Sequence, residues 1–170
     1  MARIRNENNR IMIEENSASN NASDREIAAM RIFNTPREKV FKIFTDPKHI
    51  THWWGPNGFT TTTHEMDMRS GGVWRFTMHG PDGVDYKNKV VYIEVVRPER
   101  LVYKHAGEGE HSGIHFVATV TFTDLGGKTR LDMRMRFDTA EELEEVATKH
   151  GAVEGLTQTL SRLEAFLAEK

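Results

Sequence analysis

Apolar residues recur at alternating steps of three and four positions between Thr139 and Lys170. This spacing predicts an α-helix with one apolar stripe and with Glu, Lys and Arg on the opposite side. Gly151 and Gly155 fall within the pattern, where each glycine costs about 1 kcal/mol relative to alanine. They indicate a kink, a break into two helices or the close approach of another backbone segment. The predicted stripe comprises Leu143, Val146, His150, Val153, Leu156, Leu160, Leu163 and Leu167.

The chain between residues 59 and 137 alternates apolar and polar residues, which predicts antiparallel strands with one apolar face. Gly, Pro, Asp and Ser are frequent in the turns that separate these strands. An earlier strand is expected at residues 25–34, and two short helices follow it, one after Thr35-Pro36 and one from Lys48 to Trp54. The strands after these helices are predicted at residues 59–68, 73–79, 85–96, 101–105, 114–123 and 128–137.

A sheet with one apolar face needs one cover, and the C-terminal helix is the only predicted element long enough to provide it. We therefore predict an α+β fold in which a twisted antiparallel sheet curves around that helix. Such a sheet leaves space under the helix unless large side chains fill it. A slip of one residue would turn every apolar side chain to water, so the inward faces are well defined. They are Trp74/Phe76/Met78, Phe116/Ala118/Val120/Phe122 and Leu131/Met133/Met135/Phe137, with Arg130, Asp132, Arg134 and Arg136 directed outward.

The chain of 170 residues suits one domain with a sizeable core. Residues 1–23 are rich in Asn and Ser and poor in apolar groups, which predicts a disordered tail ahead of a single domain at residues 24–170. Ile11-Met12-Ile13 is the exception. This tripeptide would either add a short edge strand or pack on a neighbouring chain, which keeps a homodimer among the candidate partners.

Composition excludes several classes of function. The 23 basic and 25 acidic residues nearly cancel, and a pI near 6.5 argues against a nucleic-acid partner, which would need a basic face. The absence of cysteine excludes disulfides and thiolate chemistry. No apolar run approaches the roughly 18 residues of a membrane span, and the start lacks the apolar core of a signal peptide, so we expect no membrane insertion and a cytoplasmic location.

Motifs for catalysis and for metal or cofactor binding are missing from the sequence. His-Glu-x-x-His, Gly-x-Ser-x-Gly and the Walker loop do not occur. The pairs His49/His52 and His111/His115 have no adjacent carboxylate at ligand spacing. We therefore assign no catalytic residue, no metal ligand and no cofactor from the sequence.

Six stretches in order along the chain carry a family resemblance. They are Thr35-Pro36-Arg37-Glu38-Lys39-Val40-Phe41, Thr45-Asp46-Pro47, Trp53-Trp54-Gly55-Pro56, Gly71-Gly72-Val73-Trp74-Arg75-Phe76, Met78-His79-Gly80-Pro81-Asp82-Gly83 and Pro98-Glu99-Arg100-Leu101-Val102. Through these stretches, residues 25 to about 168 resemble the activator of Hsp90 ATPase homologue 1-like (AHSA1-like) family, within the START/Bet v 1-like superfamily.

The resemblance implies a helix-grip fold, in which an antiparallel sheet of about seven strands holds the C-terminal helix. It also implies a cavity between sheet and helix, which the superfamily uses for lipids, hormones and polyketides. The eukaryotic co-chaperone that gave the family its name has an additional N-terminal Hsp90-binding domain. The 24 residues that precede the resemblance here are too few to replace it, so we do not expect Hsp90 as a partner.

We predict that the chain binds a small apolar molecule, lipid-like or aromatic, between sheet and helix. Core packing explains the same aromatic residues and methionines nearly as well. The alternatives are an enzyme of the aromatase/cyclase type, with Tyr86, Tyr103, His105 and His115 as polar candidates, and a stress-related, co-chaperone-like protein-binding module. The predicted ligand contacts are Trp53, Trp54, Phe59, Trp74, Phe76, Met78, Tyr86, Tyr103, Phe116, Met133, Met135, Val153, Leu156 and Leu160.

Overall fold

The computed structural model describes residues 4–6, 9–13, 25–107, 115–149 and 151–169. After two N-terminal strands, the order of elements agrees with the predicted one. Strand β3 (Glu26–Phe33) is followed by helices α1 (Arg37–Thr45) and α2 (Pro47–Ile50). Six strands then precede helices α3 (Ala140–Lys149) and α4 (Ala152–Ala168). These strands are β4 (Thr60–Met66), β5 (Val73–His79), β6 (Asp85–Val96), β7 (Arg100–Gly107), β8 (Phe116–Asp124) and β9 (Thr129–Phe137).

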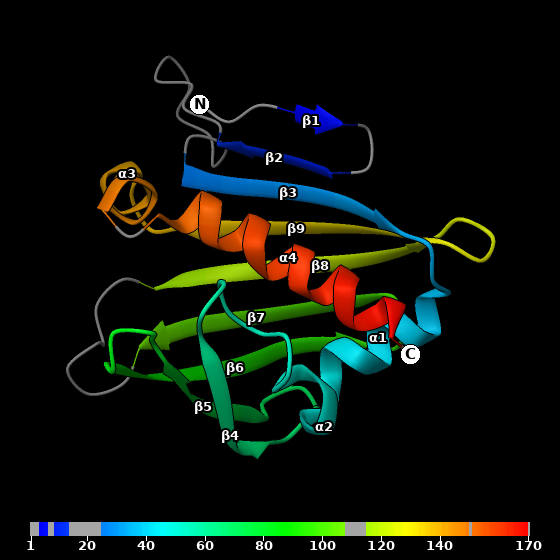
Figure 1. The fold of residues 1–170 in the computed structure, drawn as a ribbon, viewed down its shortest axis with the longest axis horizontal. Coiled ribbons are helices and arrows are strands. Elements are labelled where there is room, and N and C mark those ends of the chain that lie inside the picture. Colours follow the sequence, from blue (N-terminus) through cyan, green and yellow to red (C-terminus); the bar gives the residue numbers. More distant parts are fainter. Residues whose placement is uncertain (1–3, 7–8, 14–24, 108–114, 150, 170) are drawn as a thin grey trace.

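All strands pair antiparallel in one sheet with the order β1-β2-β3-β9-β8-β7-β6-β5-β4. The first strand of the domain, β3, therefore lies beside the last one, β9. Helix α4 crosses the face of this sheet, and α1 and α2 lie near its C-terminal end (Figure 1). Strands β3 to β9 confirm the predicted sheet of about seven strands, and β1 and β2 extend it at one edge.

Strands β1 (Ile4–Asn6) and β2 (Asn9–Ile13) belong to the segment that was predicted to be a tail. Strand β2 pairs with β3 over its whole length, with Ile11 opposite Ala29 and Ile13 opposite Ile27. The structure therefore contains the edge strand, one of the two alternatives predicted for Ile11-Met12-Ile13. Residues 14–23 lie outside the described part of the chain, so the disorder predicted for them stays a prediction.

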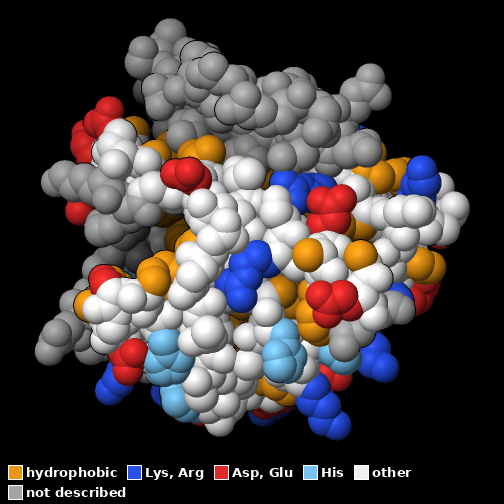
Figure 2. All heavy atoms as spheres, in the orientation of Figure 1, with side chains coloured by type: hydrophobic (Ala, Val, Ile, Leu, Met, Phe, Trp, Pro, Cys, Tyr) orange, Lys and Arg blue, Asp and Glu red, His pale blue; other side chains and the backbone are white. Residues whose placement is uncertain are grey.

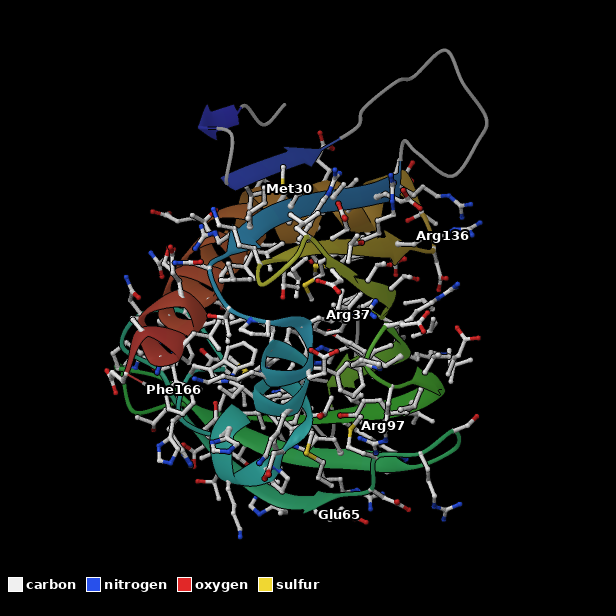
Figure 3. All side chains as sticks on the ribbon, turned by 90° about the vertical axis from the view of Figure 1, so that its right-hand side faces the viewer. Met30, Arg37, Glu65, Arg97, Arg136 and Phe166 are labelled. Atoms are coloured by element: carbon white, nitrogen blue, oxygen red, sulfur yellow. The ribbon has the colours of Figure 1, made fainter. Side chains whose placement is uncertain are left out.

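The inward faces of the sheet are those that the alternation predicts. Trp74, Val120 and Leu131 are at most 2% exposed, whereas Arg134 and Arg136 on the outer face of β9 are exposed. Figure 3 shows the sheet curving around its enclosed side, with α1 and α4 there and Arg136 pointing away from it. Register follows from burial here, because inward pairs such as Ala118/Met135 and Val120/Met133 are apolar and a slip of one residue would expose them to water.

The C-terminal helix is broken into two, one of the three outcomes that its glycines indicated. Gly151 separates α3 from α4 and has φ of 61°, a left-handed conformation that favours glycine. Gly155, one turn later, packs against the loop after α2, because a Cβ there would lie 3.5 Å from Pro56 Cγ. His150, predicted in the stripe, lies outside the described residues.

Aromatic rings fix α1 and α2 to the sheet. The ring of Phe44 on α1 lies 5.1 Å from Trp53, 6.0 Å from Trp54 and 5.6 Å from Phe122 on β8. Trp54 in turn lies 5.1 Å from Trp74 on β5. Edge-to-face pairs of this kind add about 0.5–1.5 kcal/mol each beyond the burial of their area. This cluster closes the sheet under α1 and the C-terminal half of α4.

The two glycines of the C-terminal segment are expected to respond oppositely to alanine. Gly151→Ala should lower the free energy of unfolding by about 1 kcal/mol, because a Cβ is strained in the left-handed region. Gly155→Ala should raise it by about 0.5–1 kcal/mol, because alanine favours the helix and the contact with Pro56 is of ordinary length. Urea unfolding of both variants measures this difference, and equal effects of the two substitutions would contradict a break at Gly151.

Candidate functional site

The predicted ligand contacts fall into two groups by burial. One group is at most 9% exposed and includes all three tryptophans: Trp53, Trp54, Trp74, Phe76, Tyr103, Met133, Met135, Leu156 and Leu160. The other group is half-buried: Phe59, Met78, Tyr86, Phe116 and Val153. Only the second group has surface that a ligand could cover without a rearrangement of the fold.

The tryptophans make the hydrogen bonds and ring contacts expected of buried side chains. Trp53 Nε1 donates a hydrogen bond of 3.2 Å to the Ile43 carbonyl oxygen. Trp74 Nε1 lies 3.2 Å from Thr63 Oγ1 as a donor, and its ring stacks on Phe76 with centroids 3.8 Å apart. These contacts place the tryptophan rings in the core of the domain, and a ligand contact for them stays a prediction.

One row across the inner face of the sheet is incompletely covered. Backbone pairing aligns Trp74, Val90, His105, Phe116 and Phe137 on strands β5, β6, β7, β8 and β9. Trp74 and Phe137 are at most 2% exposed and Val90 is 1% exposed, whereas Met66, which pairs with Trp74 from β4, is half-buried. His105 and Phe116, in the middle of the row, are only half-buried. Phe116 begins β8 and Phe137 ends β9, so the row crosses the sheet at one end of these strands, and the helices leave part of the inner face uncovered there.

The helices above this row show the same incomplete burial. Val153 in the first turn of α4 and Val146 on α3 pack against the core but are half-buried. Farther along α4, Leu160 and Leu163 are at most 1% exposed. We call the region between the row and the first turns of α4 the open end of the inner face, in contrast to the closed end under α1.

A loop between α2 and β4 borders the open end. Phe59 from this loop contacts Tyr86 of β6, with ring centroids 6.1 Å apart, and Tyr86 pairs with Met78 of β5. The loop is attached to α4 through Arg162, whose Nη1 donates to the carbonyl oxygens of Gly55 at 2.9 Å and Pro56 at 3.0 Å. Partial burial lowers the pKa of Arg162.

His105 is the polar group at the centre of the row. Asn88 Nδ2 donates to the Tyr86 carbonyl oxygen at 2.9 Å, so its amide oxygen, Oδ1, faces His105 Nε2 at 3.0 Å. Since Oδ1 can only accept, Nε2 carries the proton of the imidazole. Burial, assisted by the nearby His115, lowers the pKa of His105 to about 4 and keeps it neutral at pH 7. Its other nitrogen, Nδ1, is then a buried acceptor, and it has no hydrogen-bond partner among the residues that the structure describes.

Two further polar groups beside His105 have buried atoms without hydrogen-bond partners. They are the hydroxyl of Tyr103, the preceding inward residue of β7, and Nδ1 of His115, which lies next to Phe116. Burial raises the pKa of Tyr103 well above its usual value, so it is a neutral phenol. Polar atoms buried without partners are uncommon, and each one costs about 1–3 kcal/mol.

The sequence reasoning identified Tyr103 and His105 as polar candidates but missed Asn88 and Arg31. Asn88 could have been found from its period-two spacing to Val90 and Tyr92 on the inner face of β6. Arg31 lies on the inner face of β3 between Ala29 and Phe33 and is 3% exposed.

Arg31 connects β3 to helix α4. Its Nη1 donates to Ser161 Oγ at 3.1 Å and lies 3.5 Å from Glu164 Oε1. Burial lowers the pKa of Arg31, and Glu164 opposes that shift. Arg31 is therefore a structural contact of α4 on the flank opposite to Arg162.

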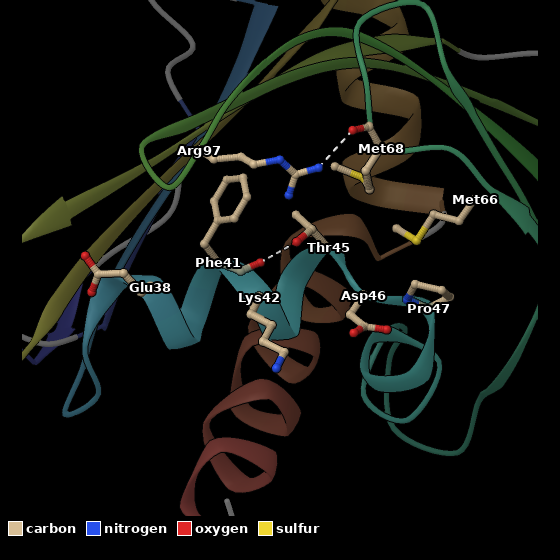
Figure 4. A pocket seen from close by; sticks show the side chains of 9 residues that line it. All are labelled: Glu38, Phe41, Lys42, Thr45, Asp46, Pro47, Met66, Met68 and Arg97. Carbon is tan, nitrogen blue, oxygen red and sulfur yellow. Dashed lines mark hydrogen bonds between the residues drawn. The ribbon is translucent and has the colours of Figure 1, made fainter.

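A separate hollow of about 380 Å³ lies on the surface between α1 and the end of β4. Figure 4 shows Arg97 spanning it, with Nη2 donating to the Met68 carbonyl oxygen at 3.0 Å and its guanidinium over the Phe41 ring at 5.9 Å. Met66 and Met68 border this hollow. Its lining is of mixed charge: Glu38, Phe41, Lys42, Thr45, Asp46, Pro47, Met66, Met68 and Arg97.

The surface histidines form no metal site within the described residues. Figure 2 shows histidine side chains over the lower part of the molecule, near α2 and β4. His49 and His52 lie against Phe166 of α4, each with its ring 6.0 Å from the phenyl ring. His79, on the outer face of β5, bonds to Thr62 Oγ1 at 2.9 Å and to Asp85 Oδ1 at 2.8 Å. Across residues 4–6, 9–13, 25–107, 115–149 and 151–169, no three His, Asp or Glu side chains gather as metal ligands.

The architecture is that of the helix-grip class, an antiparallel sheet around a C-terminal helix. Residues 34–168 match the family model described as activator of Hsp90 ATPase homolog 1-like protein. Because the match covers most of the chain, this protein belongs to the AHSA1 family. No curated protein matches it in sequence. Within the described part of the chain, none of the helices has the length and apolar character needed to cross a membrane.

Solved structures of bacterial proteins share the fold. A protein from Arthrobacter aurescens is 23% identical with a TM-score of 0.82, over 89% of this chain and 91% of that one. A protein from Rhodobacter sphaeroides is 22% identical with a TM-score of 0.79, over 95% and 99% of the two chains. The AHSA1 protein from Silicibacter pomeroyi is 24% identical with a TM-score of 0.71, over 84% and 97%. At these identities the comparisons show the fold alone.

The neutral state of His105 makes a testable contribution to stability. Its pKa is lower in the folded chain, about 4, than the usual 6.5 of an unfolded chain. The unfolded state therefore takes up the proton first as the pH falls, and stability is lost between about pH 6.5 and pH 4, by on the order of 3 kcal/mol. His105→Gln should lose this part of the pH dependence of the unfolding free energy.

The matched control for this measurement is His64→Gln, which removes an exposed histidine on β4. It separates the loss of one imidazole in general from the loss of His105 in particular. If His105→Gln and the unaltered protein lose the same free energy between pH 7 and pH 4, the imidazole is not kept neutral by burial.

Proposed function

We propose that this protein binds a small apolar molecule at the open end, between the inner face of the sheet and the first turns of α4. The observation that carries the proposal is the half-buried pair His105 and Phe116, which lies between the buried residues Val90 and Phe137 of the same row. An apolar molecule placed there would remove their remaining surface from water. Each 100 Å² of apolar area covered is worth about 2.5 kcal/mol, before the costs of association.

Residues from several elements would contribute to such a site. Phe116 and Met78 would contact the ligand from the sheet and Val153 from α4. Phe59 and Tyr86 would contact it from the border beside the loop. The closed end, with its tryptophan rings, would act as a rigid support rather than as a contact. This arrangement is that of a ligand carrier or sensor, with an apolar lining and a few polar groups that orient the ligand.

Filling the open end should abolish binding without unfolding the protein. Val153→Trp places an indole over the row, and we expect it to weaken binding of the apolar fluorophore N-phenyl-1-naphthylamine at least tenfold. The unaltered protein should bind about one equivalent. Fluorescence titration measures binding, and urea unfolding should show a change of less than about 1 kcal/mol, because a hollow accepts the larger ring.

Two further variants make the test specific. Phe166→Trp enlarges a half-buried residue of the same helix beside His49 and His52, and it should leave the titration unchanged. Trp54→Ala removes a core ring and should destabilise the fold by about 3–5 kcal/mol. If Val153→Trp costs about 1–3 kcal/mol of stability, as overpacking does, the open end is filled and the proposal fails. Probe binding that appears only in Trp54→Ala would reject it as well.

A further inference from the structure

The hydrogen-bonding groups at the open end indicate which chemical class of ligand fits it. This inference rests on the proposed function and concerns the same site. The imidazole of His105 lies on the inner face near the end of β7, with its ring centroid 4.9 Å from Phe116 and 5.8 Å from Phe76. A molecule that covers this row therefore meets His105 among aromatic rings.

The direction of each hydrogen bond around His105 is determined by a backbone carbonyl. The Tyr86 carbonyl oxygen can only accept, so it receives the amide N–H of Asn88 at 2.9 Å. The other end of that amide is then an oxygen, and it receives Nε2–H of His105 at 3.0 Å. The proton of a neutral imidazole is thus on Nε2, and Nδ1 is left as a lone-pair acceptor. Nδ1 is buried, and in the described part of the chain no group donates a hydrogen bond to it.

We propose that the ligand is an apolar molecule with a hydroxyl group, an alcohol or a phenol, whose O–H donates a hydrogen bond to Nδ1 of His105. A ketone, an ether or a carboxylate would place a second acceptor against this lone pair, which is repulsive. An ammonium group would lose its hydration without gaining a counter-charge from His105, a neutral group. A neutral donor can form this hydrogen bond to Nδ1 with the lowest desolvation cost.

Tyr103 favours a hydroxyl over other neutral donors. Tyr103 is the preceding inward residue of β7, with its Cα about 7 Å from that of His105, and its hydroxyl is also buried without a hydrogen-bond partner among the described residues. A ligand hydroxyl has both an O–H to donate and an oxygen to accept. A phenol of the protein can therefore donate to the same ligand group that donates to the imidazole, or to a second hydroxyl.

The experiment compares 2-naphthol with its methyl ether, 2-methoxynaphthalene, by calorimetric titration at pH 7. The two probes have the same ring system, and only the naphthol can donate. We expect the unaltered protein to bind 2-naphthol about tenfold more tightly, the value of one hydrogen bond to a group otherwise left unpaired. In His105→Phe, which keeps a planar ring but removes the acceptor, the two probes should bind with equal affinity.

A spectroscopic measurement gives a second readout that needs no variant. In ¹⁵N spectra of histidine-labelled protein, the Nδ1 resonance of His105 should shift on addition of 2-naphthol, while Nε2 keeps its attached proton. The methyl ether should leave the Nδ1 resonance in the range of an unprotonated nitrogen without a donor.

The outcomes separate this inference from the proposed function. Equal binding of the two probes to the unaltered protein, or tighter binding of the ether, overturns the hydroxyl assignment and leaves the apolar site in place. Binding of neither probe overturns both. A naphthol preference that persists in His105→Phe also overturns the assignment, because the donor would then be bonded elsewhere.

Discussion

A sheet with one apolar face has to be covered on that face, and helix α4 alone is too narrow to do so. The seven strands β3 to β9, spaced about 4.8 Å apart, extend over roughly 29 Å, whereas a helix with its side chains is about 10 Å wide. Curvature of the sheet reduces the gap, and α1, α2 and α3 cover part of the remainder (Figure 1). Where none of them reaches, the inner face keeps accessible surface, and that is where the candidate site lies.

The position of the open end follows from how α4 is fastened. Arg31 bonds to Ser161 and approaches Glu164 on one flank of the helix, and Arg162 bonds to the loop at Gly55 and Pro56 on the other. All of these contacts belong to the C-terminal half of α4. In its first turn, Val153 makes apolar contacts that are only half-buried, and Gly151 interrupts the backbone just before it. Gln158 Oε1 also accepts from the Asn57 backbone N–H at 2.9 Å and Gly155 packs on Pro56, so the helix is fastened to the loop from Gly155 onward.

Membership of the AHSA1 family defines the fold but not the ligand. The distinctive chemistry of this chain lies in the groups at the open end that could orient a bound molecule. His105 supplies an acceptor and Tyr103 a hydroxyl, and the Asn88 amide sets the tautomer of the imidazole. Neutral groups suit an apolar site, because a buried charge without a partner would cost far more than these unpaired atoms.

The periodicity of apolar residues along the chain is sufficient to predict most of this fold. The alternation on β5, β8 and β9 specified their inward faces, because a slip by one residue would expose every apolar side chain. The three-and-four spacing specified the C-terminal helix, and its glycines marked the break at Gly151 and the contact at Gly155 as alternatives. Tertiary structure alone decided which predicted contacts are core and which keep accessible surface, since Trp54 and Phe116 look equally apolar in sequence. It also decided that Asn88, Arg31 and His105 face inward with particular partners. Hydrogen-bond direction depends on which atoms from distant strands meet, and residue spacing along one strand carries no information about that.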